Sequence, residues 1–167
     1  MKRFSRLIGF IIVFITATAA FCTVSFAATV GQQLPGPEAG WQRIDNIDKN
    51  IKYNGPWTSG YYTDNGNYWG GAGIFGSYLE SNIHFKFYGT KLRILNSKAY
   101  DRYDGIRVSI DGVAAGTINQ YMSTGGYHYL LFEKTGLSLG IHDVVISPPA
   151  SAPSSDKLRL YVWDLIP

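Results

Sequence analysis

Cysteine is nearly missing from this chain, because its 167 residues contain a single one, Cys22, inside an apolar stretch near the N-terminus. Residues 28–167 therefore have no disulfide framework and no thiol chemistry. Histidine is almost as scarce, since only His84, His128 and His142 are present, each alone and at an alternating position of a predicted strand. Isolated histidines of this kind do not predict a transition-metal site.

Residues 28–167 also lack a net charge. Three of the 15 Lys and Arg residues lie in the first 27 positions, whereas all 12 Asp and Glu residues follow them, so residues 28–167 are formally neutral. A basic surface for nucleic acid or anionic lipid is therefore not expected, and nucleic acid is not predicted as a partner.

The first 27 residues have the pattern of a secretory signal peptide. A basic start at residues 2–6 precedes an apolar run at residues 7–15, and Ser25-Phe26-Ala27 places small residues where a signal peptidase cuts. We expect cleavage after Ala27 and a mature form without a membrane span. The alternative is a permanent anchor, since the apolar region is nearly long enough to cross a bilayer.

Helical periodicity is absent from the rest of the chain. Residues 28–40 are rich in Gly and Pro and predict a flexible lead-in, so the domain proper covers residues 41–167. From there on apolar and polar residues alternate, as in Ile83, Phe85 and Phe87, and this alternation predicts β-strands.

The predicted strands are short and are separated by turn residues. Gly89-Thr90 predicts a hairpin-like turn between strands at 83–88 and 92–94, and Asp111-Gly112 predicts a tight turn of type I′. A last strand, at residues 158–165, should return beside the first strand after a Pro-rich loop. Without crossover helices, this pattern predicts an all-β fold, an antiparallel two-sheet β-sandwich. The other strands are expected at 106–110, 127–133 and 141–146.

Four segments carry a resemblance to a known family. They are Trp41–Trp57 (WQRIDNIDKNIKYNGPW), Asn82–Leu95 (NIHFKFYGTKLRIL), Gly105–Val113 (GIRVSIDGV) and Leu131–His142 (LFEKTGLSLGIH). Together they resemble the galactose-binding-like jelly-roll modules, similar to carbohydrate-binding modules, that are appended to bacterial secreted glycosidases, lyases and surface proteins. The resemblance implies a jelly-roll sandwich that binds sugars through loop aromatics and polar groups. It also implies that a structural calcium ion can be present.

Two catalytic motifs match in their letters but not in their context. Residues 136–140, GLSLG, fit the nucleophile elbow of hydrolases, yet a strand follows Ser138 where that motif requires a helix. Residues 71–76, GAGIFG, fit a dinucleotide-binding loop without the flanking strand and helix. The spacing of carboxylate pairs such as Asp101 and Asp104 does not predict a shared cleft. We therefore expect no enzymatic activity.

A dense group of side-chain oxygens lies at residues 45–50. Asp45, Asn46, Asp48 and Asn50 offer oxygens of the kind that calcium accepts, although the ordered spacing of a calcium-binding loop is missing. Asp45 and Asp48 are the candidate ligands of a structural calcium ion, and no other cofactor is predicted. The alternative is that these carboxylates bind no metal.

Aromatic residues are abundant and fall into two settings. Those in alternating segments, namely Trp41, Tyr53, Trp57 and Trp163, are expected in the core. Others lie in loops rich in Gly, Asn and Asp, where a ring offers a flat face to a sugar and polar neighbours bond its hydroxyls. The alternative is that the loop rings only cover the ends of the sandwich. The expected ligand-binding residues are Tyr68, Trp69, Tyr100, Asp101, Arg102, Tyr103 and Tyr121, with Trp69 stacking on the sugar.

These expectations combine into a function. The sequence favours a secreted, non-catalytic carbohydrate-binding module, extracellular or in the cell envelope, whose partner is a polysaccharide or a cell-surface glycan. A structural or adhesive envelope protein that binds a protein partner is the alternative, and a small secreted hydrolase is the third. These three functions differ in what the loops would do: bind a sugar, bind a protein or cleave a bond in a substrate.

Overall fold

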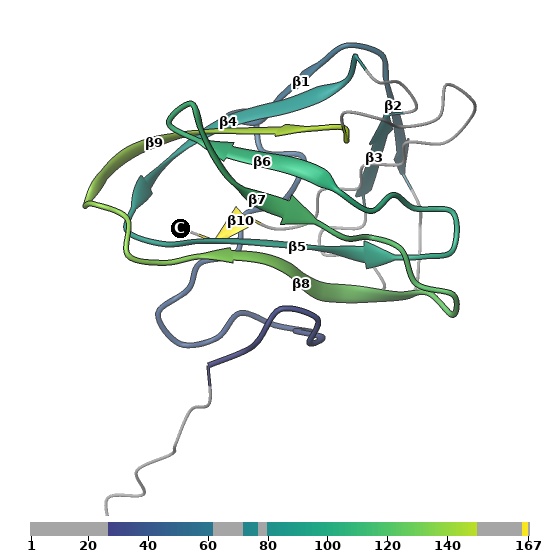
Figure 1. Cartoon of the computed structure of the whole chain (residues 1–167), viewed down its shortest axis with the longest axis horizontal. Helices are drawn as coiled ribbons and strands as arrows, with labels where there is room; N and C mark the ends of the chain where they lie inside the picture. The colour runs from purple at the N-terminus through teal and green to yellow at the C-terminus, as the bar shows by residue number, and fades with distance from the viewer. Residues whose placement is uncertain (1–26, 62–71, 77–79, 150–164, 167) are drawn as a thin grey trace, which may run out of the picture.

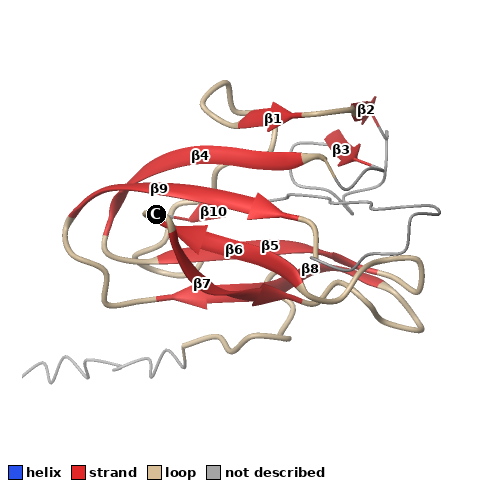
Figure 2. Ribbon diagram, turned by 45° about the horizontal axis from the view of Figure 1, so that its top comes forward, coloured by secondary structure: helices blue, strands red, loops and turns tan. Residues whose placement is uncertain are grey.

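The computed structural model describes residues 27–61, 72–76, 80–149 and 165–166, so the expected signal peptide lies almost wholly outside the described residues. Within these ranges the chain forms strands and no helix, as Figure 2 shows. No described segment is therefore a helix that could cross a membrane. The strands are β1 (Lys52–Asn54), β2 (Trp57–Tyr61), β3 (Ala72–Gly76), β4 (Asn82–Gly89), β5 (Leu92–Lys98), β6 (Ile106–Ile110), β7 (Val113–Ile118), β8 (Gly126–Lys134), β9 (Gly140–Ser147) and β10 (Leu165–Ile166).

The strands form antiparallel sheets that lie in two layers. One sheet has the order β1-β4-β9-β6-β7, a second has the order β10-β5-β8, and β2 pairs with β3. Figure 1 shows the two larger sheets one over the other, with β2 and β3 at one end. The predicted all-β fold, an antiparallel β-sandwich, is confirmed.

The main core lies between the two larger sheets. β4 buries Ile83, Phe85 and Phe87 and turns the residues between them outward, and β6 and β9 alternate in the same way. Ile94 of β5 and Phe132 of β8 approach this cluster from the other sheet. Burial of each such side chain contributes about 1.5–3 kcal/mol, so these alternating faces supply the main driving force for folding.

Two of the expected core aromatics lie at the edge of this cluster. Tyr53 and Trp57 are half-buried and pack on one another edge to face, with ring centres 5.2 Å apart. The indole nitrogen of Trp57 donates to the carbonyl of Asn54 at 2.8 Å, which satisfies its polar group at the start of β2. Trp163 lies outside the described residues.

Residues 28–40 pack against the three-stranded sheet, although their composition predicts a flexible lead-in. The backbone nitrogen of Leu34 donates to the carbonyl of His128, and that of Gly31 donates to Leu130, each at 2.7 Å. This cover explains why β5 is buried on both faces rather than on one. A second apolar cluster results, made of Ala28, Leu34, Leu95 and Leu130 with Trp41 against it.

The expected hairpin between β4 and β5 is wrong. β4 pairs with β1 and β9, whereas β5 pairs with β10 and β8, so the turn at residues 89–91 crosses from one sheet to the other. The apolar alternation predicts both strands correctly. Both inward faces meet in one core, which they reach from opposite sheets.

The turn between β6 and β7 is confirmed. Asp111 has a φ of 53° and Gly112 a φ of 76°, as a tight turn of type I′ requires, and the two strands pair on either side of it. The last strand differs from its expected position. β10 pairs with β5 in the three-stranded sheet, whereas β1 lies in the other sheet. The rest of that predicted strand, residues 158–164, lies outside the described residues.

Candidate functional site

Two connections meet at one end of the sandwich, the right end in Figure 1. The β5–β6 connection, residues 99–105, and the β7–β8 connection, residues 119–125, are joined by a parallel bridge between Ala99 and Tyr121. Backbone bonds reinforce it, with the nitrogen of Ala99 donating to Gln120 at 3.0 Å and that of Met122 donating to Ala99 at 3.1 Å. The structure thus brings two of the predicted ligand loops together.

The predicted side chains of these loops differ in what they offer to a ligand. Tyr100 is 75% exposed and Tyr121 is 52% exposed, so both rings are accessible. The carboxylate of Asp101 pairs with the guanidinium of Arg102, whose side chain is only 8% exposed and is therefore held in place. Tyr103 is half-buried and packs against the main core.

A hollow of about 280 Å³ lies between the two loops, and we call it the loop-end hollow. Gly125 has a φ of 74°, and a Cβ atom there would lie 3.3 Å from the carbonyl oxygen of Lys98. The backbone therefore comes close enough to β5 to form a wall only because position 125 is glycine. The residues that line the hollow include Lys98, Arg102, Thr124, Gly125, Gly126 and Tyr127.

The sequence indicates only part of this hollow. Arg102, an expected ligand-binding residue, lies in its lining, whereas Lys98 was not predicted, because its position depends on the bridge between the two loops. Tyr127 also lines the hollow, and it directly follows the glycine pair Gly125-Gly126. Tyr68 and Trp69, which were expected to contact the ligand, lie outside the described residues.

The predicted calcium ligands form local turns. Asp45 Oδ1 accepts a hydrogen bond from the nitrogen of Ile47 at 3.2 Å, and Asp48 Oδ1 accepts one from Asn50 at 2.8 Å. Burial raises the pKa of Asp45 above its usual value. Among the described residues no group of three or more His, Cys, Asp or Glu side chains could hold a metal ion. The calcium ion therefore stays a prediction.

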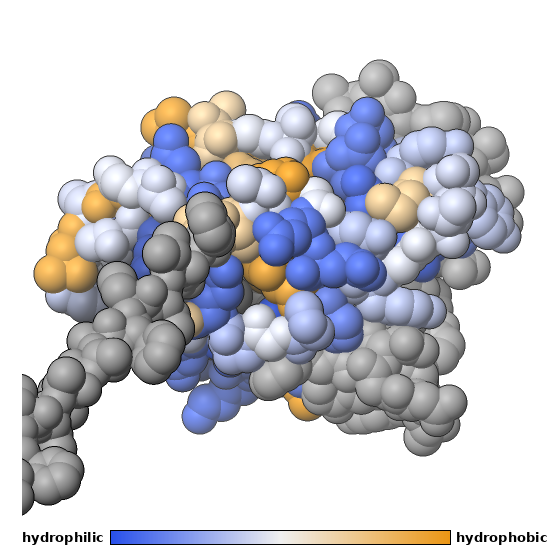
Figure 3. Space-filling model, turned by 90° about the horizontal axis from the view of Figure 1, so that it is seen from below, coloured by the Kyte–Doolittle hydropathy of each residue, from blue (hydrophilic) through white to orange (hydrophobic). Residues whose placement is uncertain are grey.

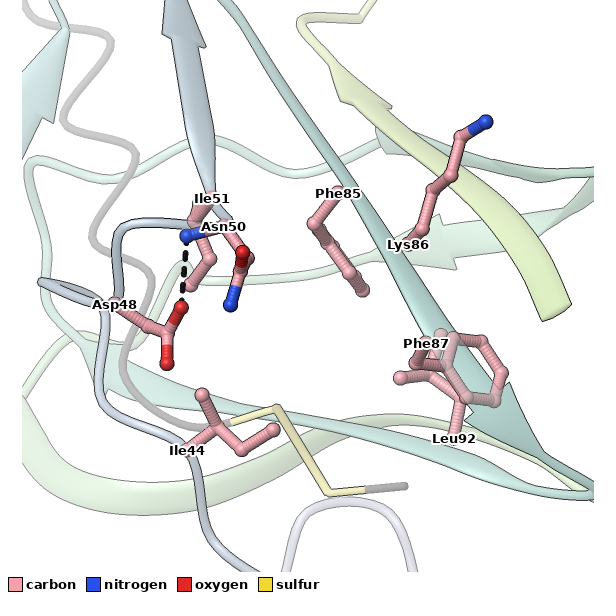
Figure 4. A pocket seen from close by; sticks show the side chains of 8 residues that line it. All are labelled: Ile44, Asp48, Asn50, Ile51, Phe85, Lys86, Phe87 and Leu92. Atoms are coloured by element: carbon pink, nitrogen blue, oxygen red, sulfur yellow. Dashed lines mark hydrogen bonds between the residues drawn. The ribbon is translucent and has the colours of Figure 1, made fainter.

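A small cavity lies beneath this segment. Figure 4 shows Asp48 and Asn50 on one side of it and the apolar side chains of Ile44, Phe85 and Leu92 around it. Its volume is about 60 Å³, which is room for water rather than for a sugar ring. The cavity is therefore not a ligand site of the expected kind.

Asp111, His142 and Ser138 lie together at the opposite end of the sandwich. His142 Nδ1 is 2.7 Å from Asp111 Oδ2, and its Nε2 donates to the main-chain carbonyl of Ser138 at 2.8 Å. A serine nucleophile would require Nε2 to face the hydroxyl group instead. These three residues therefore fasten the β6–β7 turn to the β8–β9 connection, as expected of a turn residue at position 138.

Comparisons with known proteins find similarity in fold. A scan against family models and a search of curated proteins find no match. Among solved structures, the chain is similar to an exo-beta-1,3-galactanase from Phanerochaete chrysosporium with beta-1,3-galactotriose, at 14% identity and a TM-score of 0.55, over 77% of this chain and 29% of that chain. The same enzyme with galactose gives 15% identity and a TM-score of 0.54 over the same shares. The catalytic domain of a GH87 alpha-1,3-glucanase in complex with nigerose is a weaker match, with 14% identity and a TM-score of 0.48, over 79% of this chain and 28% of that chain.

These comparisons contradict the expectation that the chain is not an enzyme. The solved structures that it resembles with a TM-score above 0.5 are described as an enzyme, an exo-beta-1,3-galactanase. At such low identity the likeness to the galactanase establishes a shared fold. This chain spans less than a third of the length of those proteins, 29% for the galactanase.

Proposed function

We propose that this protein recognises carbohydrate and that the loop-end hollow is its binding site. The observation that carries the proposal is the meeting of the β5–β6 and β7–β8 connections, because the loops that form the polar hollow also carry the exposed rings of Tyr100 and Tyr121. Flat rings next to fixed polar groups are the combination that a sugar requires, since a sugar has an apolar C–H face and a rim of hydroxyls.

The polar groups of the hollow supply the hydrogen bonds. Asp101 holds the guanidinium of Arg102, so the arginine presents its donors in a fixed direction at little cost in side-chain entropy. Thr124 adds a hydroxyl group that can donate or accept. A shallow site of this kind binds with a Kd between about 1 mM and 1 μM.

A galactan is the first ligand to test. The galactanase with the same fold is described in complex with beta-1,3-galactotriose and with galactose. We further propose that the protein is exported and that its mature form begins at Ala28, because the first 27 residues have the basic, apolar and small-residue regions of a signal peptide. The glycan would then lie outside the cell or in its envelope.

The test combines binding and turnover. Residues 28–167 would be screened on a glycan array, and each glycan that binds would be incubated with the protein while released reducing sugar is measured. We expect binding that is lost when Tyr100 and Tyr121 are both replaced by Ala. Sugar release would assign a hydrolytic activity to this chain itself. A folded protein that binds no glycan on the array would contradict the proposal.

A further inference from the structure

A second hollow lies at the other end of β5, where the β4–β5 and β8–β9 connections approach each other, and we call it the Trp41 hollow. Its volume is about 510 Å³, and it is open and shallow. Its wall combines exposed apolar surface, with Tyr88 64% and Leu139 69% exposed, and the polar side chains of Gln42, Thr90 and Lys91. Figure 3 shows hydrophobic residues on the surface of this end of the molecule, at the left.

The ring of Trp41 contacts two positively charged side chains, and one of them lines this hollow. The ammonium nitrogen of Lys91 lies 4.2 Å from the centre of the Trp41 ring, and the guanidinium carbon of Arg93 lies 4.1 Å from it. Such cation–π contacts fix the position of a flexible side chain. The contact with Trp41 therefore holds the ammonium group of Lys91 in the lining of the hollow.

The two cations differ in how their charge is balanced. Arg93 is buried and pairs with both Glu38 and Glu133. Lys91 pairs with no carboxylate among the described residues. Among the described residues, no carboxylate neutralises the ammonium group of Lys91. This group can therefore pair with an acidic ligand in the Trp41 hollow.

We propose that the Trp41 hollow binds an acidic sugar unit, a uronic acid, and that Lys91 bonds its carboxylate. The exposed ring of Tyr88 provides a face for the C–H side of the sugar, and Gln42 and Thr90 provide partners for its hydroxyls. A bond between an ammonium and a carboxylate is roughly twice as strong as one between neutral groups, so Lys91 selects an acidic unit over a neutral one. This inference rests on the proposed glycan-binding function and adds a second site to it.

The two hollows lie at opposite ends of β5. The strand has seven residues, Leu92–Lys98, and at about 3.3 Å per residue it separates the hollows by roughly 20 Å. A single sugar ring cannot reach both. A long glycan, or two neighbouring chains, can engage both hollows together and bind more tightly than either site alone.

Calorimetry with a short oligogalacturonide tests the second site, and the carboxyl-reduced form of the same oligomer is the matched neutral ligand. We expect wild-type protein to bind the acidic oligomer and Lys91→Met to weaken this binding by at least about tenfold, the loss of a hydrogen bond to a charged group. The exposed Lys52 of β1 supplies the control, because Lys52→Met removes the same charge elsewhere and should leave the affinity unchanged. Binding should also weaken as salt is added.

The outcomes separate this inference from the proposed function. Equal affinity of wild type and Lys91→Met for the acidic oligomer, or no binding of it by wild type, overturns the inference even if neutral glycans still bind the loop-end hollow. Acidic binding that persists when Tyr100 and Tyr121 are replaced, while no neutral glycan binds, supports the Trp41 hollow and overturns the loop-end site. Thermal melts of each variant show whether a loss reflects unfolding.

Discussion

At the scale of single residues, the surroundings of His142 favour its protonated form. Both of its ring nitrogens face acceptors, the carboxylate of Asp111 and the carbonyl of Ser138, so a ring that carries both protons satisfies both contacts. The hydrogen bond to Asp111 is the main cause that raises the pKa of His142 above 6.5, and the bond to Ser138 adds to it. The pKa of Asp111 is lowered, first by the backbone nitrogen of Asp143 and then by His142.

These shifts predict how stability depends on pH. A histidine with a raised pKa in the folded state contributes stability that is complete below its unfolded value of 6.5 and is lost as pH rises through the folded value. The pKa of Asp111 is lowered in the folded state, so its ionised carboxylate stabilises the fold at pH values above 3.8, the ordinary pKa of Asp. This contribution is lost as pH falls through the lower folded pKa. Melting temperatures of wild type should therefore fall from weakly acidic to alkaline pH, and His142→Gln should remove most of this fall. An equal fall in both proteins would contradict this account of His142.

Gly125 is a second residue whose substitution has a predictable effect. Its φ of 74° is strained for any other residue, and a Cβ atom would lie 3.3 Å from the carbonyl oxygen of Lys98. Gly125→Ala should cost about 1–3 kcal/mol of stability and deform the loop-end hollow. Gly140→Ala is the matched control, because no atom lies within 4 Å of a Cβ there. Denaturant unfolding of the two variants measures the difference, and equal stabilities would contradict the described backbone.

At the scale of elements, Arg93 ties the N-terminal segment to the three-stranded sheet. It lies on β5, is 2% exposed, and pairs with Glu38 from the segment and Glu133 from β8. Arg93→Met removes the cation and leaves two partly buried carboxylates without it. Removing one partner of a buried ion pair costs about 3–5 kcal/mol, so this variant should unfold at markedly lower denaturant. It should also be cut faster by protease within residues 28–40, and unchanged unfolding and cleavage would contradict this role.

The longer strands were predictable, whereas the short strands β2 and β3 and the pairing of strands into sheets were not. The alternation of Ile83, Phe85 and Phe87 fixes which side of β4 faces the core, because side chains alternate along any strand. The same alternation does not say which strand lies beside it, and so the sequence predicts a hairpin at the β4–β5 connection, which in fact crosses between sheets. Pairing depends on contacts between residues far apart in the sequence, which no local pattern contains.

At the scale of the whole molecule, the same distinction holds for the candidate site. The composition of two loops indicates Tyr100, Arg102 and Tyr121, and the structure joins those loops through Ala99. The hollow itself, with Lys98 in its wall, arises only when the end of β5 meets the β7–β8 connection. The Trp41 hollow was missed because Trp41 lies in an alternating segment and was expected in the core.

The central claim is that the loop-end hollow binds carbohydrate, and calorimetry tests it most directly. The best glycan from the array would be titrated into wild type, Tyr121→Ala and Val113→Ala, which replaces an exposed apolar side chain that lines neither hollow. Loss of a ring at a binding hot spot costs about 2 kcal/mol, or roughly thirtyfold in Kd. If the best ligand is neutral, Tyr121→Ala should weaken binding by this factor with an unchanged melting temperature, and Val113→Ala should bind as wild type does. Unchanged affinity of Tyr121→Ala for every neutral glycan that binds would contradict the claim.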